Sequence, residues 1–197
     1  MRTDVAPIKK NKKVAWGITG CGDRLEETID AMNKLKECYE KQVNIKVYLS
    51  KAGEQVAKWY KLYDTLEKNF KKNFVEFGPN SPFLAGDLET GKFEFLIIAP
   101  ATSNTVAKIS VGICDTLLCN SAIMALKAYV PVYIMPSDLH EGTTITKLPN
   151  DKTLKLRIRK EDAENAKKLS TMDGVFVLKD PGEISGVFMK HFGRPQL

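Results

Sequence analysis

The sequence predicts an α/β fold, in which helices cover both faces of a mostly parallel sheet and so form three layers. Two observations lead to this prediction. Short apolar runs typical of buried strands alternate with stretches of helical periodicity, as they do where helices connect parallel strands. The length of 197 residues and the hydrophobic fraction of 43% also suit one domain, residues 1–197, with an extensive core.

The first part of the chain contains two strand–helix pairs. An apolar run that ends in a glycine turn, 13–22, is typical of a buried strand, and apolar residues at spacings of three and four predict a helix over 23–42. A second strand is expected over 44–50, followed by a second helix over 52–66. The pattern fails at 73–91, where glycine and proline predict a long loop that has room for a short turn of helix.

The second part begins with the strongest buried strand, 93–99. A helix is expected from residue 105 to about 111, another helix over 115–128 and a strand over 131–135. The remaining expected elements are a strand over 154–158, a helix over 161–169, a strand over 174–178 and a last helix over 181–192. The alternation of strands and helices therefore continues to the end of the chain.

The charge of the chain favours an acidic partner or a phosphorylated ligand. Thirty basic and 24 acidic residues give a net charge of +6, and the isoelectric point is about 9.0. The lysines are spread over the expected helices, and no nucleic-acid-binding motif is present. We therefore expect no nucleic-acid partner.

Cysteine spacing and hydropathy exclude further classes. The four cysteines form no CxxC pair and have no histidine at ligand spacing, which predicts free thiols and no metal site. Residues 1–13 are polar and do not resemble a signal peptide, and no apolar run approaches the ~20 residues that cross a bilayer. We expect a cytoplasmic protein that does not bind membranes.

Polar side chains follow three predicted strands at the point where each strand ends. Thr19 follows the first strand, Ser50 follows the second, and 102–105 follow the strand over 93–99. Because the carboxyl ends of parallel strands meet at one edge of the sheet, these side chains should converge there. Ligands of α/β folds bind at this edge.

The glycine turn after the first strand has two interpretations. Gly17, Gly20 and Gly22 follow a G-x-x-G-x-G spacing that matches neither the dinucleotide fingerprint nor the P-loop. The turn is either a tight strand-to-helix connection or a place where backbone N–H groups approach an anion. Cys21 is expected at a helix N-terminus, which would lower its pKa and make it reactive; the alternative is a small residue that fills the turn.

The segment after the strand over 93–99 is more informative. It begins with Pro100 and Ala101 and continues with four consecutive hydroxyl or amide side chains, Thr102, Ser103, Asn104 and Thr105. One capping residue satisfies a helix N-terminus, so four such side chains exceed what capping requires. The excess suits a phosphate or a polar heterocycle.

Other polar residues have structural interpretations. Lys108 lies either on the surface or at a subunit boundary. Asp115, after Gly112, is typical of a helix break and an N-cap. His140 and His191 have no nucleophile elbow nearby, and we expect each to be a surface or packing residue.

Three blocks of the sequence together resemble a known family. They are Gly17-Ile-Thr-Gly-Cys21, Ala99-Pro-Ala-Thr-Ser-Asn-Thr-Val-Ala-Lys-Ile109 and Gly112-Ile-Cys-Asp-Thr-Leu-Leu118. Over nearly its whole length the chain resembles the FMN-binding flavoproteins related to phosphopantothenoylcysteine decarboxylase. Within that superfamily it looks most like the archaeoflavoproteins and the dihydromethanopterin reductases, on the segments 81–86, 131–138 and 159–165.

The resemblance implies a Rossmann-like fold of the phosphopantothenoylcysteine decarboxylase type that binds FMN noncovalently, usually at a trimer interface. The residues that would hold the phosphate and ribityl chain, by position, are Gly17, Thr19, Gly20, Cys21, Ser50, Pro100, Ala101, Thr102, Ser103, Asn104 and Thr105. Those that would lie near the flavin are Met135, Pro136 and Ser137. The expected partners are copies of the chain itself, in a trimer or a higher multiple.

Departures from the family pattern narrow the activity that the resemblance implies. The decarboxylases carry a Pro-x-Met-Asn motif that Pro136-Ser-Asp-Leu139 lacks, and no histidine precedes His140 to act as their base. The arginine that grips phosphate in the flavin prenyltransferases is absent near Met135. The resemblance then implies an FMN-dependent oxidoreductase for electron transfer, which takes electrons from a ferredoxin-like carrier and passes them to another acceptor. The alternatives are a pterin reductase and a non-redox subunit like that of dipicolinate synthase.

Overall fold

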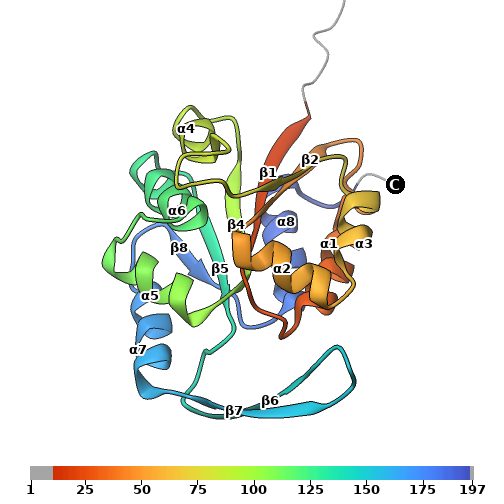
Figure 1. The fold of residues 1–197 in the computed structure, drawn as a ribbon. Helices are drawn as coiled ribbons and strands as arrows, with labels where there is room; N and C mark the ends of the chain where they lie inside the picture. The colour runs from red at the N-terminus through yellow and green to blue at the C-terminus, as the bar shows by residue number, and fades with distance from the viewer. Residues whose placement is uncertain (1–10, 196–197) are drawn as a thin grey trace, which may run out of the picture.

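Six parallel strands form the central sheet of the computed structural model, which describes residues 11–195 (Figure 1). Their order is β3-β2-β1-β4-β5-β8. The strands span β1 Lys12–Ile18, β2 Val43–Leu49, β3 Asn73–Val75, β4 Phe95–Ala101, β5 Val132–Pro136 and β8 Val175–Val177. Residues 1–10, which belong to the segment expected to lack a signal peptide, lie outside the described residues.

Helices cover both faces of this sheet, so the three-layer α/β prediction is confirmed (Figure 1). The helices on one face are α1 Leu25–Cys38, α2 Lys51–Trp59, α3 Tyr63–Asn69 and α8 Ile184–Phe192, the last preceded by a 3-10 turn, Pro181–Glu183. Those on the other face are α4 Leu84–Glu89, α5 Ser103–Val111, α6 Leu117–Lys127 and α7 Lys160–Leu169.

The central strands are buried on both sides, which is why they read as continuous apolar runs in the sequence. All seven residues of β4 are buried. In β1, Trp16 packs edge-on against Phe70 in one core layer, while the neighbouring Ala15 belongs to the other layer. The Trp16 indole N–H also donates to the Ala99 carbonyl at 2.7 Å, which ties β1 to β4.

Two predictions between β2 and β4 require correction. The single helix expected over 52–66 is two helices, because Lys61 adopts a left-handed backbone conformation (φ 58°) that a helix cannot continue. The loop expected over 73–91 contains the edge strand β3 as well as α4. A strand of three residues is too short to show a period of two, so the sequence pattern does not reveal it.

A separate hairpin lies beyond the carboxyl ends of the sheet strands, apart from the main body (Figure 1). Its strands are β6 Gly142–Lys147 and β7 Thr153–Ile158, and they are antiparallel. The strand expected over 154–158 is thus confirmed as β7, but it pairs with β6, which the sequence analysis missed, and not with the parallel sheet. None of the described helices combines the length and the apolar character needed to cross a membrane.

Candidate functional site

A cavity of about 350 Å³ opens between the carboxyl edge of the sheet and the β6–β7 hairpin. Its walls are the 20–23 turn after β1, the start of α5 at 102–104, Ser137 and Asp138 after β5, Tyr60, and the hairpin residues Thr144, Thr146 and Leu156. The edge of the sheet at which the sequence analysis expects a ligand site therefore does border a cavity. Its size lies within the range of small-molecule sites.

The glycine turn is shaped by close packing. A side chain on Gly20 would place its Cβ 2.6 Å from the Cβ of Ala52, and one on Gly22 would meet the Tyr60 ring at 2.3 Å. Gly17 lies earlier, inside β1, where a Cβ would come within 2.7 Å of the Leu118 side chain. All three glycines thus have a packing role, and Gly20 and Gly22 also line the cavity.

Thr19 joins the turn after β1 to the end of β4. Its hydroxyl donates to the Pro100 carbonyl at 2.8 Å and accepts the Thr102 N–H at 2.8 Å. The residue is only 2% exposed, so its hydroxyl serves these two contacts. Thr19 therefore positions the start of α5 relative to the glycine turn.

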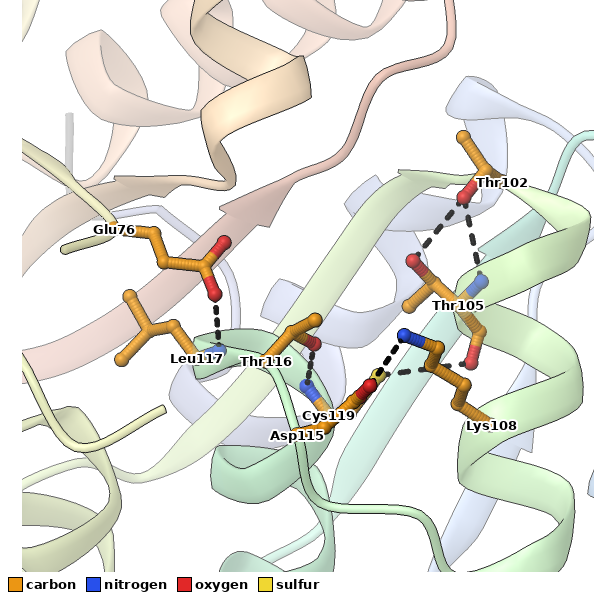
Figure 2. A network of polar contacts seen from close by, with 8 residues as sticks. All are labelled: Glu76, Thr102, Thr105, Lys108, Asp115, Thr116, Leu117 and Cys119. Carbon is orange, nitrogen blue, oxygen red and sulfur yellow. Dashed lines mark hydrogen bonds and ion pairs between the residues drawn. The ribbon is translucent and has the colours of Figure 1, made fainter. Parts of the chain in front are cut away.

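The start of α5 presents N–H groups to the cavity. Thr102 caps the helix by accepting the Thr105 N–H at 3.3 Å, and the two hydroxyls lie 3.1 Å apart (Figure 2). The backbone N–H groups of Ser103 and Asn104 have no acceptor within residues 11–195. Unpaired N–H groups in the first turn of a helix are favourable contacts for an anion.

The cavity wall also contains two carboxyl groups, those of Asp23 and Asp138. The Asp138 carboxylate accepts hydrogen bonds from the hydroxyls of Ser103 and Ser137. Burial raises the pKa of Asp23 above its ordinary value of 3.8; the neighbouring Arg24 partly offsets this rise, and Asp138 adds to it. The cavity therefore offers N–H donors on one wall and carboxylate acceptors on another, which suits a molecule with both an anionic group and O–H or N–H groups.

The expected low pKa of Cys21 is wrong. Burial of the thiol raises its pKa to about 11, and its Sγ lies 3.7 Å from the Asp23 carbonyl. The helix after the turn begins only at Leu25, so its N-terminus does not stabilise a thiolate at residue 21. Cys21 is a protonated, small residue in a tight turn.

Several residues expected to hold the ligand do not line the cavity. Ser50 accepts the Gly53 N–H at 2.9 Å and so caps α2. The other expected residues that do not line the cavity are buried. They are Gly17, Thr19, Pro100, Ala101, Thr105, Met135 and Pro136. The expected residues that do meet at the cavity are Gly20, Cys21, Thr102, Ser103, Asn104 and Ser137.

The N-cap expected in the segment Asp115-Thr-Leu-Leu118 is present, but the capping residue is Thr116 and not Asp115. Thr116 caps α6 by accepting the Cys119 N–H at 3.4 Å, because its extended backbone places the hydroxyl over the first turn (Figure 2). Asp115 instead forms an ion pair with Lys108 at 2.8 Å. Lys108 is thus a partly exposed residue that links α5 to the loop before α6.

Glu76, at the end of β3, is a residue that the sequence analysis missed. One of its carboxylate oxygens accepts the Leu117 N–H at 2.8 Å (Figure 2). The other accepts the Lys51 N–H at 3.4 Å. A single carboxylate therefore stabilises the first turns of α6 and α2. Nothing in the local sequence marks Glu76, because both partners are far away along the chain.

Tyr60 and the hairpin residues were missed for the same reason. The Tyr60 hydroxyl donates to the Lys147 carbonyl at 3.0 Å and so holds the hairpin over the cavity. The packing role expected of His191 is confirmed: the ring packs against Phe95, and its Nε2 lies 2.8 Å from the Tyr133 hydroxyl. His140 is exposed, as expected.

Comparison with known proteins gives a consistent result. A family model described as "Flavoprotein" matches residues 5–187. The dihydromethanopterin reductase (acceptor) of Methanocaldococcus jannaschii is 32% identical, over 90% of this chain and 96% of its own length. An uncharacterized protein of the same organism is 51% identical, over 91% and 95%. The crystal structure of Burkholderia xenovorans DmrB in complex with FMN, described as a cubic protein cage for redox transfer, is 30% identical with a TM-score of 0.74, over 92% and 96%.

Proposed function

The chain belongs to the flavoprotein family, and on that premise we propose that it binds FMN in the cavity beside the start of α5 and transfers electrons through it. The observation that carries this proposal is the pair of unpaired N–H groups at Ser103 and Asn104, which face a cavity at the carboxyl edge of a parallel sheet. The FMN bound by the similar DmrB supports the choice of ligand.

The groups that line the cavity fit the chemistry of this cofactor. The N–H groups and hydroxyls at the start of α5 suit the phosphate, which carries negative charge. The Asp138 carboxylate, fixed by Ser103 and Ser137, suits the O–H and N–H groups of the ribityl chain and the ring. Bound FMN supplies the one- and two-electron chemistry that protein side chains lack.

The residues around the cavity favour electron transfer over acid–base chemistry. No histidine lines the described part of the cavity, and the Cys21 thiol, with a pKa of about 11, stays protonated at neutral pH. The walls thus offer groups that bind and orient a cofactor. The electron donor that we propose is a small acidic iron–sulfur protein of the ferredoxin type.

We also propose that the chain self-associates, as a trimer or a multiple of trimers. The cage formed by DmrB, which is similar over nearly the whole chain, supports assembly. Light scattering tests this part of the proposal, and a monomer would contradict it.

A pterin reductase is the second candidate function. Its support is the similarity to a dihydromethanopterin reductase over 96% of that protein's length. Anaerobic oxidation of the FMN-reduced protein by a dihydropterin, compared with its reduction by ferredoxin, distinguishes the two functions.

The visible absorption spectrum of the purified protein tests the main proposal. We expect flavin bands, and an apoprotein that regains them when FMN is added. A well-folded protein that stays colourless in excess FMN would contradict the proposal and favour a non-redox subunit.

A further inference from the structure

The β6–β7 hairpin has two faces with different surroundings. Thr144, Thr146 and Leu156 point toward the cavity and form part of its wall. Because side chains alternate along a strand, the neighbouring residues point the other way. The cross-strand pairs on this outward face are Thr143 with Arg157, Ile145 with Lys155, and Lys147 with Thr153. Here this surface is called the basic face of the hairpin.

The basic face combines positive charge with an exposed apolar centre. Lys155 and Arg157 are exposed, and within residues 11–195 neither forms an ion pair. Lys147 pairs with Asp151 at 2.7 Å, but both side chains remain mostly exposed. Between these cations lies Ile145, which is 68% exposed and, with Lys147, also borders a hollow whose opposite wall includes Glu26 and Glu27 at the start of α1. An apolar centre with charged residues around it is the common composition of a protein interface.

We infer that the basic face of the hairpin is the docking surface for an acidic electron-carrying protein. This inference rests on the proposed function, because it takes the cavity as the place where the electrons arrive. The β6–β7 hairpin has the cavity on one face and the basic face on the other. A carrier bound on the basic face would therefore be separated from the cavity only by these two strands (Figure 1). The positive charges attract an acidic carrier and orient it.

Charge complementarity selects this occupant over a second copy of the chain. The same basic face of a second copy would be repelled by Lys155 and Arg157, whereas an acidic carrier would pair with them. In the transfer itself, two reduced carriers each give up one electron and become oxidised. Two protons from solvent accompany the two electrons to one FMN.

The test reverses the charge of the basic face in the FMN-loaded protein. We compare Lys155→Glu/Arg157→Glu with the parent by anaerobic stopped-flow, with a reduced plant-type ferredoxin as the probe and flavin absorbance as the readout. At low ionic strength we expect the second-order rate constant of the variant to fall ~10-fold or more, and its dependence on salt to flatten. Reduction by dithionite, which needs no docking surface, should be unchanged.

A matched control separates the local effect from the overall charge. Lys41→Glu/Lys71→Glu makes the same change in net charge near the amino ends of β2 and β3, at the opposite edge of the sheet. This variant should keep the rate of the parent within about twofold. Equal losses in both variants, or an unchanged rate in the hairpin variant, would overturn the inference.

A second measurement does not depend on the flavin. Isothermal titration calorimetry of the oxidised ferredoxin should show binding to the parent and to the control variant, and weaker binding to Lys155→Glu/Arg157→Glu. Ile145→Ser, which keeps all charges, should also weaken binding because it removes the apolar centre. Binding to anionic phospholipid vesicles but not to ferredoxin would overturn the inference. A protein that binds ferredoxin on this face but retains no FMN would instead contradict the proposed function.

Discussion

The parallel sheet and the β6–β7 hairpin form opposite walls of one cavity, yet they are stabilised in different ways. The central sheet strands are covered on both faces, and Trp16 in β1 has no exposed surface. The hairpin is covered on neither face: Ile145 is 68% exposed on its outside and Leu156 is 45% exposed on its cavity side. One wall is therefore fixed by the core, while the other depends on few contacts and can move at low cost.

The largest expected effect tests this difference in stability directly. Trp16→Ala should lower the free energy of unfolding by about 3–5 kcal/mol, because it leaves a cavity in the core and removes the hydrogen bond to Ala99. Ile145→Ala in the hairpin should change it by less than about 0.5 kcal/mol. Urea denaturation measures both values, and similar losses would show that the hairpin is part of the cooperative core.

The next effect compares two turns. Gly20→Ala should cost about 1–3 kcal/mol of stability, because the new methyl group would lie 2.6 Å from the Cβ of Ala52. Gly78→Ala is the matched control, since a Cβ there has no atom within 4 Å. Thermal unfolding of the two variants is the measurement. Equal melting temperatures would mean that the glycine turn adjusts without strain.

Two threonine substitutions, one near each wall of the cavity, compare how much the walls contribute to FMN binding. Thr105→Val removes the hydroxyl that lies 3.1 Å from that of Thr102, so the cap at the start of α5 loosens, and we expect the Kd for FMN to rise about tenfold. Thr146→Val on the hairpin should raise it less, because that wall is more exposed. Fluorescence titration of the apoprotein with FMN gives both constants. A Thr105→Val protein that holds FMN as tightly as its parent would show that this hydroxyl pair does not support the proposed phosphate site.

The smallest effect concerns the pH dependence of stability. The hydrogen bonds from Arg159, at 2.6 and 2.8 Å, hold the pKa of Asp162 below its ordinary value of 3.8. A folded-state pKa below the unfolded value stabilises the protein above about pH 4, and this contribution is lost as the pH falls through the folded-state pKa. Asp162→Asn should thus be less stable at about pH 6 and approach the parent in acid.

Asp151 in the hairpin turn is the counterpart of Asp162. Its pKa is also lowered, by Lys147, but both side chains are exposed and solvent screens their attraction. Asp151→Asn should leave the pH profile of stability unchanged. Chemical denaturation across the acid range compares the two variants, and parallel profiles would remove the distinction between the buried and the exposed carboxylate.

The same contrast explains what the sequence predicts well. The buried strands are signalled by continuous apolar runs, and the polar segment that follows β4 marks the edge where the cavity lies. β3, β6 and the break at Lys61 have no such signal, because they are short or are stabilised by contacts distant in sequence. For the cavity, Ser103 follows from the pattern and Ser137 from the family resemblance, whereas Tyr60 and Thr144 reach it only through the folded chain.

The carboxylate of Glu76 has a consequence for how a nucleotide can lie. It already occupies the first N–H groups of α2 and α6, while Ser50 takes the N–H of Gly53. Under the proposed function, the phosphate is therefore expected at α5, where the N–H groups of Ser103 and Asn104 have no acceptor within residues 11–195. Glu76 does not line the cavity, yet by accepting N–H groups at the starts of α2 and α6 it favours this position for the phosphate.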